Sequence, residues 1–207
     1  MARDTQSIVK MSRREGYALH PKAHKALVKR PTIPGQHGNS RGGRMGKTSQ
    51  YALQLREKQK VKRLYGLLEK QFSNLMKEAT RREGQSGQNL LQFLELRLDN
   101  VVYRAGYAPS RRAARQLVTH GHFVLNGVRV DIPSIRVKLG DAIVVRDHSK
   151  ATEYFKKLDD VSPAPSTTPA WLKVDRKKIA VTVTSSPVRD DAEPDINEQL
   201  IVEYYSR

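Results

Sequence analysis

A short basic helix followed at once by a hairpin turn, over Ser110–Val130, constrains this chain more than any other segment. The hydroxyl of Ser110 can cap the start of the helix, and Gly121 suits the left-handed position that ends one. Asn126-Gly127 is the strongest short-range signal for a two-residue β-hairpin. Apolar residues recur at helical spacing between the two ends, at Ala114, Leu117 and Val118. The segment is therefore predicted to fold as a helix packed on a small hairpin.

Three arginines of this helix lie away from its apolar stripe: Arg111, Arg112 and Arg115. Arg111 and Arg115 are four residues apart and so are neighbours on the helix surface, where like charges repel unless an anion lies close. Two interpretations follow. The arginines either form a solvated face, as surface charges usually do, or contact a polyanion.

Turn and strand signals extend this region into a small domain. Turn-forming residues between 132 and 141 precede an apolar strand at Ile143–Val145. Upstream, leucines and valines spaced by three or four predict a helix from about Asn89 to a glycine cap at Gly106. We therefore expect a domain over residues 89–157.

The charge balance favours a polyanionic partner. The chain has 38 Lys and Arg against 21 Asp and Glu, which gives a formal net charge of +17. The excess is uneven, because residues 1–50 hold 11 basic and 2 acidic residues, whereas residues 161–207 hold 6 and 7. This asymmetry indicates that the N-terminal and middle regions contact nucleic acid and that the C-terminal region has another role.

Hydropathy and cysteine content exclude several classes of protein. No run of about 18 apolar residues is present to span a bilayer, and the N-terminus lacks the apolar core of a secretory signal. Cysteine is absent, which excludes disulfides, cysteine nucleophiles and thiolate zinc sites. We expect a cytoplasmic protein with no membrane partner.

The first 47 residues are predicted to form a basic extended arm that is partly disordered without RNA, because they contain few large apolar residues. From Tyr51 to about Thr80, apolar residues at helical spacing predict one long amphipathic helix, which Gly66 would kink or break in two. Basic residues crowd the first half of that helix and favour phosphate contact: Arg56, Lys58, Lys60, Lys62 and Arg63.

The C-terminal region begins with a proline- and serine-rich stretch at Ser162–Pro169, which predicts an exposed connection. Beyond it, Ile179–Thr184 and Gln199–Tyr205 predict two strands that return to an existing lobe. The expected fold class is α+β. A mainly helical lobe, made of residues 48–88 and 158–207, carries the small helix-hairpin domain as an insertion.

Ordered motifs from about residue 34 to the terminus resemble the family of bacterial small-subunit ribosomal protein four. Single motifs such as His-Gly-His are weak signals, but their order and spacing across most of the chain make coincidence implausible. The motifs are Pro34–Gly38, Gln54–Val61 with Tyr65-Gly66, Arg97–Arg104, Ala113–Val118, His120–His122, Val124–Gly127, Ile132–Ser134, Pro169–Leu172 and Asn197–Arg207.

The resemblance implies a structural, non-enzymatic, ribosome-bound protein with no cofactor and no small-molecule substrate. It implies primary binding to the 5′ domain of 16S ribosomal RNA (rRNA), nucleation of small-subunit assembly and a share in decoding accuracy. It also implies a position near the channel by which messenger RNA enters, beside small-subunit proteins three and five, with the messenger as a further contact. In that family the helix-hairpin unit is a widespread RNA-binding fold inserted in a mostly helical lobe.

We expect RNA-contacting residues in three regions. The arm contributes Gln36, His37, Arg41, Arg44 and Lys47, and the long helix contributes the five basic residues named above. In the helix-hairpin domain the resemblance implies a larger set. Its members are Arg104, Ser110, Arg111, Arg112, Arg115, His120, Gly121, His122, Asn126, Gly127 and Lys138.

One departure from the family concerns zinc. Many relatives hold a cysteine cluster near the N-terminus that binds the metal, whereas Met11–Gly16 contains no cysteine. His20 and His24 are four residues apart, but Pro21 lies between them and no cysteine or carboxylate completes a ligand set. We therefore expect no zinc, and histidines that face solvent or RNA.

Two rival functions are disfavoured by the sequence. An RNA-modifying enzyme with the same small RNA-binding fold would need a catalytic domain, and the acidic run Asp190–Asp195 is typical of a solvated loop. The Gly42–Thr48 segment has one residue too few for a nucleotide-phosphate loop, and no strand precedes it. A DNA-binding helix-turn-helix would place the Arg111 helix in a major groove, where the hairpin that follows is awkward.

Overall fold

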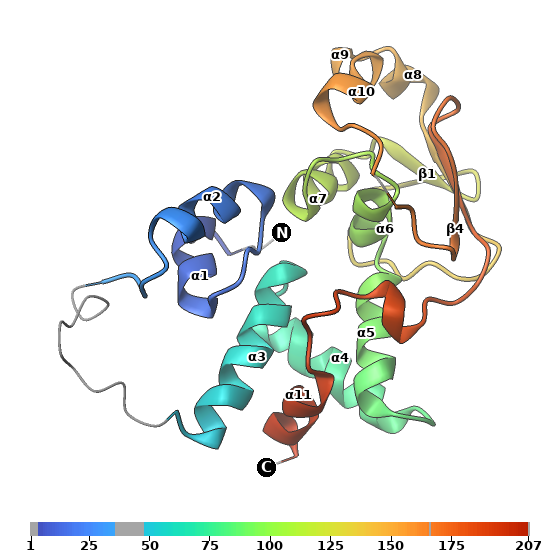
Figure 1. Cartoon of the computed structure of the whole chain (residues 1–207). Helices are drawn as coiled ribbons and strands as arrows, with labels where there is room; N and C mark the ends of the chain where they lie inside the picture. Colours follow the sequence, from blue (N-terminus) through green and yellow to red (C-terminus); the bar gives the residue numbers. More distant parts are fainter. Residues whose placement is uncertain (1–3, 36–47, 166, 207) are drawn as a thin grey trace. The chain divides into compact units, whose positions relative to one another are not determined.

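The computed structural model describes residues 4–35, 48–165 and 167–206 (Figure 1). The chain forms two compact units. Unit 1 comprises Met1–Leu90 and Asp195–Arg207, and unit 2 comprises Leu91–Pro194. The strand-containing unit is thus inserted between two segments of a helical unit, in agreement with the predicted α+β fold class.

Unit 1 begins with two helices, α1 (Ile8–Glu15) and α2 (Pro21–Lys29), where the sequence predicted an extended arm. That prediction is wrong for these residues, because Met11, Leu19 and Ala23 supply enough apolar surface to be buried. Helix α1 packs against both α2 and α3. The arm candidates Gln36, His37, Arg41, Arg44 and Lys47 lie outside the described residues.

The predicted long helix is divided into α3 (Gln50–Leu64) and α4 (Glu69–Arg81). Gly66 lies between them with φ of +67°, a left-handed conformation that glycine adopts without a steric penalty. The amide of Leu67 donates to the carbonyl of Lys62 and so closes the end of α3. The predicted break at this glycine is confirmed.

The end of the chain is a helix, α11 (Glu198–Tyr205), and the strand predicted there is wrong. The helix packs on α3 (Figure 1). Ile201 is fully buried, and the ring centres of Tyr205 and Phe72 are 6.2 Å apart. Alternating apolar residues over a short run cannot by themselves distinguish a buried strand from a helix. Here the packing of Glu198–Tyr205 against α3 favours the helix.

Unit 2 contains a five-stranded antiparallel sheet with the order β2-β1-β3-β5-β4. The hairpin of β1 (Phe123–Leu125) and β2 (Val128–Val130) confirms the Asn-Gly prediction, and the predicted third strand is β3 (Ala142–Val145). The remaining strands are β4 (Leu172–Asp175) and β5 (Ala180–Val183).

The expected boundary at residue 158 needs correction because β5 pairs with β3, Ile143 lying opposite Val181. Strands β4 and β5 therefore complete the sheet of unit 2, and the unit extends to Pro194. Three short helices and a 3-10 helix occupy the connections around these strands. They are α8 (Asp147–Lys150), α9 (Glu153–Lys156), α10 (Leu158–Val161) and η2 (Arg189–Asp191).

The helix predicted from Asn89 to Gly106 is two helices, α5 (Ser86–Glu95) and α6 (Leu98–Arg104). Between them the backbone leaves helical geometry to pair with a distant segment. Arg97 forms an isolated β-bridge with Arg136, and the amide of Val137 donates to the carbonyl of Leu96 at 2.9 Å. The predicted cap at Gly106 is confirmed, with φ of +76°.

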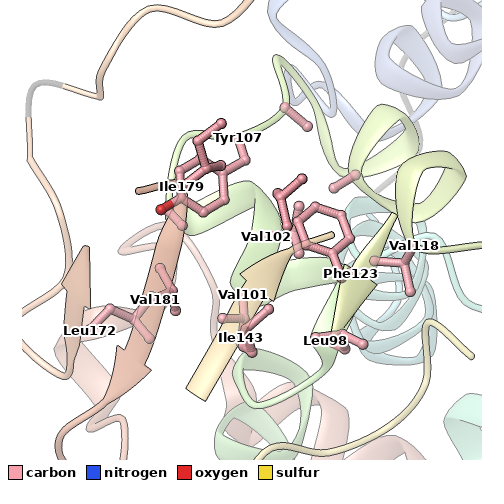
Figure 2. Packing of buried hydrophobic residues seen from close by; sticks show 14 of the residues in the cluster. Leu98, Val101, Val102, Tyr107, Val118, Phe123, Ile143, Leu172, Ile179 and Val181 are labelled. Atoms are coloured by element: carbon pink, nitrogen blue, oxygen red, sulfur yellow. The ribbon is translucent and has the colours of Figure 1, made fainter. Parts of the chain in front are cut away.

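A single apolar core joins α6, α7 (Arg111–Thr119) and the sheet (Figure 2). Leu98 and Val102 of α6 and Val118 of α7 meet Phe123 and Ile143 of the strands in this core. Because both helices are anchored on the sheet, their polar faces have fixed positions.

Candidate nucleic-acid interface

The start of α7 is fixed as the sequence predicted. The Ser110 hydroxyl accepts a hydrogen bond from the amide of Ala113 at 3.3 Å, which satisfies one of the free amides of the first turn. Ala114 and Val118 are fully buried in the core. Ser110 is itself buried, so its role in this structure is capping.

The arginines of α7 differ in their partners. Arg111 donates to the Glu193 carboxylate and to the side-chain oxygen of Asn100, each at 2.9 Å. Arg115 pairs with Asp99 at 3.3 Å. Arg112 is exposed, and it has no ion pair within the described parts of the chain. The anion that would relieve repulsion between Arg111 and Arg115 is thus supplied by the protein.

Two further arginines are held by buried carboxylates. Arg104 makes two hydrogen bonds to Glu95, at 2.8 and 3.0 Å, and Arg97 makes two to Asp99, at 2.8 and 3.1 Å. The side chains of Glu95 and Asp99 are only 1% and 6% exposed. We call this set the arginine network: Arg97, Arg104, Arg111 and Arg115 with Glu95, Asp99 and Glu193. Such paired guanidinium groups are strongly oriented by their carboxylates.

The basic residues of α3 are also paired within the protein. Arg56 and Arg63 both contact Glu15 of α1, whose side chain is 0% exposed. Burial raises the pKa of Glu15, although the charges of Arg56 and Arg63 oppose the shift. These two arginines therefore hold α1 against α3.

The lysines of α3 have carboxylate partners as well. Lys58 is buried, pairs with Glu69 at 2.8 Å and lies 4.3 Å from the ring centre of Tyr204. Burial alone would raise the pKa of Glu69, but hydrogen bonds from Lys58, Lys62 and Tyr205 outweigh it and lower the pKa to about 2. Lys60 pairs with Glu57 at 2.9 Å and donates to the Asp195 carbonyl.

Asn126 and Gly127 shape the hairpin turn with φ of +49° and +85°. The Asn126 side chain donates to Asp141 at 2.8 Å and accepts from the amide of Ala142 at 2.9 Å. Asp141 also accepts from the amide of Lys138, whose side chain is exposed. Asn126 thus ties the turn to the loop before β3.

The turn after α7 brings four cationic or titratable side chains around one glycine. His120 and His122 have ring centres 6.0 Å apart, and Arg146 donates to the Gly121 carbonyl at 3.3 Å. The Arg129 guanidinium lies so close to Gly121 that a Cβ atom there would be 2.7 Å from its Nε. We call His120, His122, Arg129 and Arg146 the Gly121 cluster.

No carboxylate among the described residues pairs with the arginines of the Gly121 cluster. His122 contacts the Ser149 hydroxyl through Nδ1 at 3.0 Å. Burial lowers the pKa of His122, and the charges of His120 and Arg146 lower it further. The cluster therefore offers hydrogen-bond donors and positive charge without an internal anion, which suits a phosphate group.

Arg129 and Arg146 were missed by the sequence reasoning. Arg129 lies in a Val-Arg-Val strand, where one charge between two apolar residues is typical of any half-exposed strand. Arg146 immediately follows β3, and only the folded sheet brings it to Gly121. The pairing of the strands could have indicated these two arginines. Phe123 lies opposite both Val130 and Val145, so the residues next to them, Arg129 and Arg146, come close to the start of β1.

Other functional groups are not assembled in the part of the chain that the structure describes. No group of three or more His, Cys, Asp or Glu side chains there could hold a metal ion. The Nδ1 atom of His20 accepts from the amide of Lys22 and caps α2. No described helix is both long and apolar enough to cross a membrane.

Two family models match consecutive parts of the chain, with a boundary close to the start of unit 2. The family model described as ribosomal protein S4/S9 N-terminal domain matches residues 3–95, and the S4 domain matches residues 96–143. Proteins named small ribosomal subunit protein uS4 match over their whole length and the whole of this chain. They include those of Chlorobium limicola (52% identical) and Chloroherpeton thalassium (49%), and the uS4A protein of Clostridium botulinum (51%). The chain therefore belongs to the family of small ribosomal subunit protein uS4, with an S4 RNA-binding domain, and is a structural protein of the ribosome and not an enzyme.

Proposed function

We propose that this protein is a primary binder of 16S rRNA, contacts its 5′ domain and nucleates assembly of the small subunit in the cytoplasm. In the finished subunit it contributes to decoding accuracy near the channel by which messenger RNA enters, with small-subunit proteins three and five as neighbours. Family membership and the net charge of +17 support this proposal.

The observation that carries the proposal is the Gly121 cluster. Its arginines have no carboxylate partner among the described residues, in contrast to those of the arginine network. We assign direct phosphate contact to this cluster and to the exposed side chains of Arg112 and Lys138. Gly121, Asn126 and Gly127 shape the surface, because each has positive φ at a turn that borders it.

The paired basic residues have a different part in the proposed interface. Arg104, Arg111 and Arg115, and the α3 residues Arg56 to Arg63, are oriented by carboxylates, so RNA must compete with those carboxylates for them. We propose that they contribute positive potential to RNA binding, each group within its own unit. The arm candidates remain proposed contacts.

Recognition is expected to rest on RNA shape and backbone. The major groove of A-form RNA is too deep and narrow for side chains to read, so the 2′-hydroxyls and phosphates at junctions are the accessible features. Aromatic residues make up only 6% of the chain, which disfavours a platform for stacked single-strand bases. A folded rRNA junction suits such a surface better than duplex DNA.

Salt-titrated binding tests the proposal. The full chain is titrated with the 16S 5′ domain, an unrelated structured RNA and duplex DNA of equal charge. A protein that neutralises six to ten phosphates loses about 10³–10⁵ in affinity on duplex DNA between 50 and 200 mM salt, and a steep dependence is expected here. Selective binding to the ribosomal fragment at physiological salt supports the proposal, and equal affinity for all three contradicts it.

A matched pair of variants locates the surface. Arg129→Gln removes one exposed cation from β2, and Lys173→Gln removes one from β4 at the opposite edge of the same sheet. We expect Arg129→Gln to weaken rRNA binding and Lys173→Gln to leave it within about twofold, since a single distant charge is screened at physiological salt. Equal losses would show that only net charge matters.

A further inference from the structure

Glu193 differs from the other carboxylates of the arginine network. Its oxygen Oε1 lies 2.9 Å from Nη2 of Arg111 and 3.6 Å from Nη2 of Arg104, so one oxygen is shared by two guanidinium groups. Within the described chain, Oε2 of Glu193 has no partner. The side chain is 22% exposed, against 1% for Glu95.

The two arginines are held in place without Glu193. Arg104 makes two hydrogen bonds to Glu95, and Arg111 donates through Nε to Asn100 and lies 4.6 Å from the ring centre of Tyr103. Asn100 in turn donates to Glu95 at 2.8 Å. Loss of the Glu193 carboxylate would therefore leave both guanidinium groups oriented by these contacts, and another anion could take the place of the carboxylate beside the two Nη2 atoms.

The backbone of Glu193 itself is weakly anchored, although its neighbour Ala192 is buried. Glu193 follows η2 and precedes Pro194, outside any helix or strand. Its backbone carbonyl accepts only a long hydrogen bond, 3.5 Å, from Arg189. A partly exposed ion pair contributes little stability, because solvent screens it. An incoming anion could displace the carboxylate at small cost.

We propose that Glu193 is an internal competitor for a phosphate site formed by Arg104 and Arg111. Its carboxylate occupies this site in the free protein, and an RNA phosphate must displace it to bind there. Glu193 thereby lowers the affinity of the basic surface for RNA that places a phosphate at these arginines. The inference rests on the proposed RNA-binding function and adds to it a residue that tunes RNA affinity.

Glu193→Gln tests the proposal, with Asp190→Asn as the matched control. Both changes remove one negative charge from the same segment, but Asp190 is exposed and has no ion pair in the described chain. We expect Glu193→Gln to tighten binding to the 16S 5′ domain about three- to fivefold more than the control, the range that a partly exposed ion pair can supply. In an Arg111→Gln background this excess should disappear.

Glu193→Asp provides a second test that leaves net charge unchanged. The shorter side chain withdraws the carboxylate from the arginines, so affinity should rise even though no charge is lost. Affinity of Glu193→Gln equal to or below that of Asp190→Asn, or no gain for Glu193→Asp, overturns the inference. Equal binding of the unaltered chain to ribosomal and unrelated RNA would instead overturn the proposed function.

Discussion

The arginine network and the Gly121 cluster lie in the same unit and contain the same kind of side chain, yet their charges are used differently. In the network, Glu95 and Asp99 are buried and neutralise arginines of α6 and α7 within the fold. In the cluster, Arg129 and Arg146 meet backbone and histidine rather than carboxylate. The number of positive charges on a helix therefore does not identify a binding surface. The partners of each charge do.

The largest effect is expected from breaking the network at its most buried pair. Asp99→Ala leaves Arg97 buried and without its two hydrogen bonds. Removing one partner of a buried ion pair typically costs about 3–5 kcal/mol in the free energy of unfolding, and chemical denaturation would measure it. The control is Asp159→Ala, which breaks a pair with Arg176 whose carboxylate is exposed and should cost under about 1 kcal/mol. Similar losses of stability in the two variants would show that the buried ion pairs of the arginine network contribute no more than an exposed pair.

A charge reversal in α7 separates folding from binding. Arg115→Glu places a carboxylate beside Asp99, so we expect a loss of about 2–3 kcal/mol in stability, somewhat below that of a fully buried broken pair. Arg112→Glu lies on the exposed face of the same helix and should change stability by less than about 0.5 kcal/mol while weakening rRNA binding. Thermal unfolding would measure the stability of both variants, and titration with rRNA would measure their affinity. Arg111 and Arg115 were both expected from the sequence to contact RNA, but each is paired with a carboxylate, so we expect reversal of either charge to weaken folding as well as binding.

Removal of the arginines of the Gly121 cluster should weaken RNA binding and leave the stability of the fold nearly unchanged. The double variant Arg129→Gln and Arg146→Gln is expected to lower rRNA affinity at least about tenfold, since each charged hydrogen bond to phosphate contributes about 1.5–3 kcal/mol. Its melting temperature should change little, because neither arginine has a carboxylate partner in the described chain. A large fall in melting temperature without loss of affinity would assign the cluster to the fold.

The smallest effect concerns pH. Burial, His120 and Arg146 hold the pKa of His122 below its usual value of 6.5. The unfolded chain then binds a proton more readily, so His122 contributes stability above pH 6.5 that is lost as the pH falls through its folded pKa. His122→Gln should reduce this pH dependence in chemical denaturation. Bound phosphate would raise the pKa of His122, and an NMR titration with and without RNA that showed no rise would place phosphate elsewhere.

Local features of the fold were predictable because their causes lie close together in sequence. The Ser110 cap, the helix end at Gly121 and the Asn126-Gly127 hairpin each depend on a few adjacent residues, as does the break at Gly66. The same reasoning failed at α11 and at the break between α5 and α6. There, packing on α3 and pairing with residues 135–137 decide the backbone.

The candidate site was less predictable than the fold for the same reason. Arg111 pairs with Glu193, which is 82 residues away in the sequence, and Arg56 pairs with Glu15, which is 41 residues away. No periodicity or local spacing reveals such pairs. The histidines and glycine of the turn were identified from sequence, but Arg129 and Arg146 join them only after three strands have paired.

Unit 1 is made from both ends of the chain, and this affects how the protein can be synthesised. Unit 2 has all its residues once Pro194 has been added, whereas α11, which covers α3, is translated only after the whole of unit 2. Until then Gln54 lacks its hydrogen bond to Glu203, and Lys58 lacks the ring of Tyr204. The helical unit can therefore close only after every residue of the inserted unit has been translated.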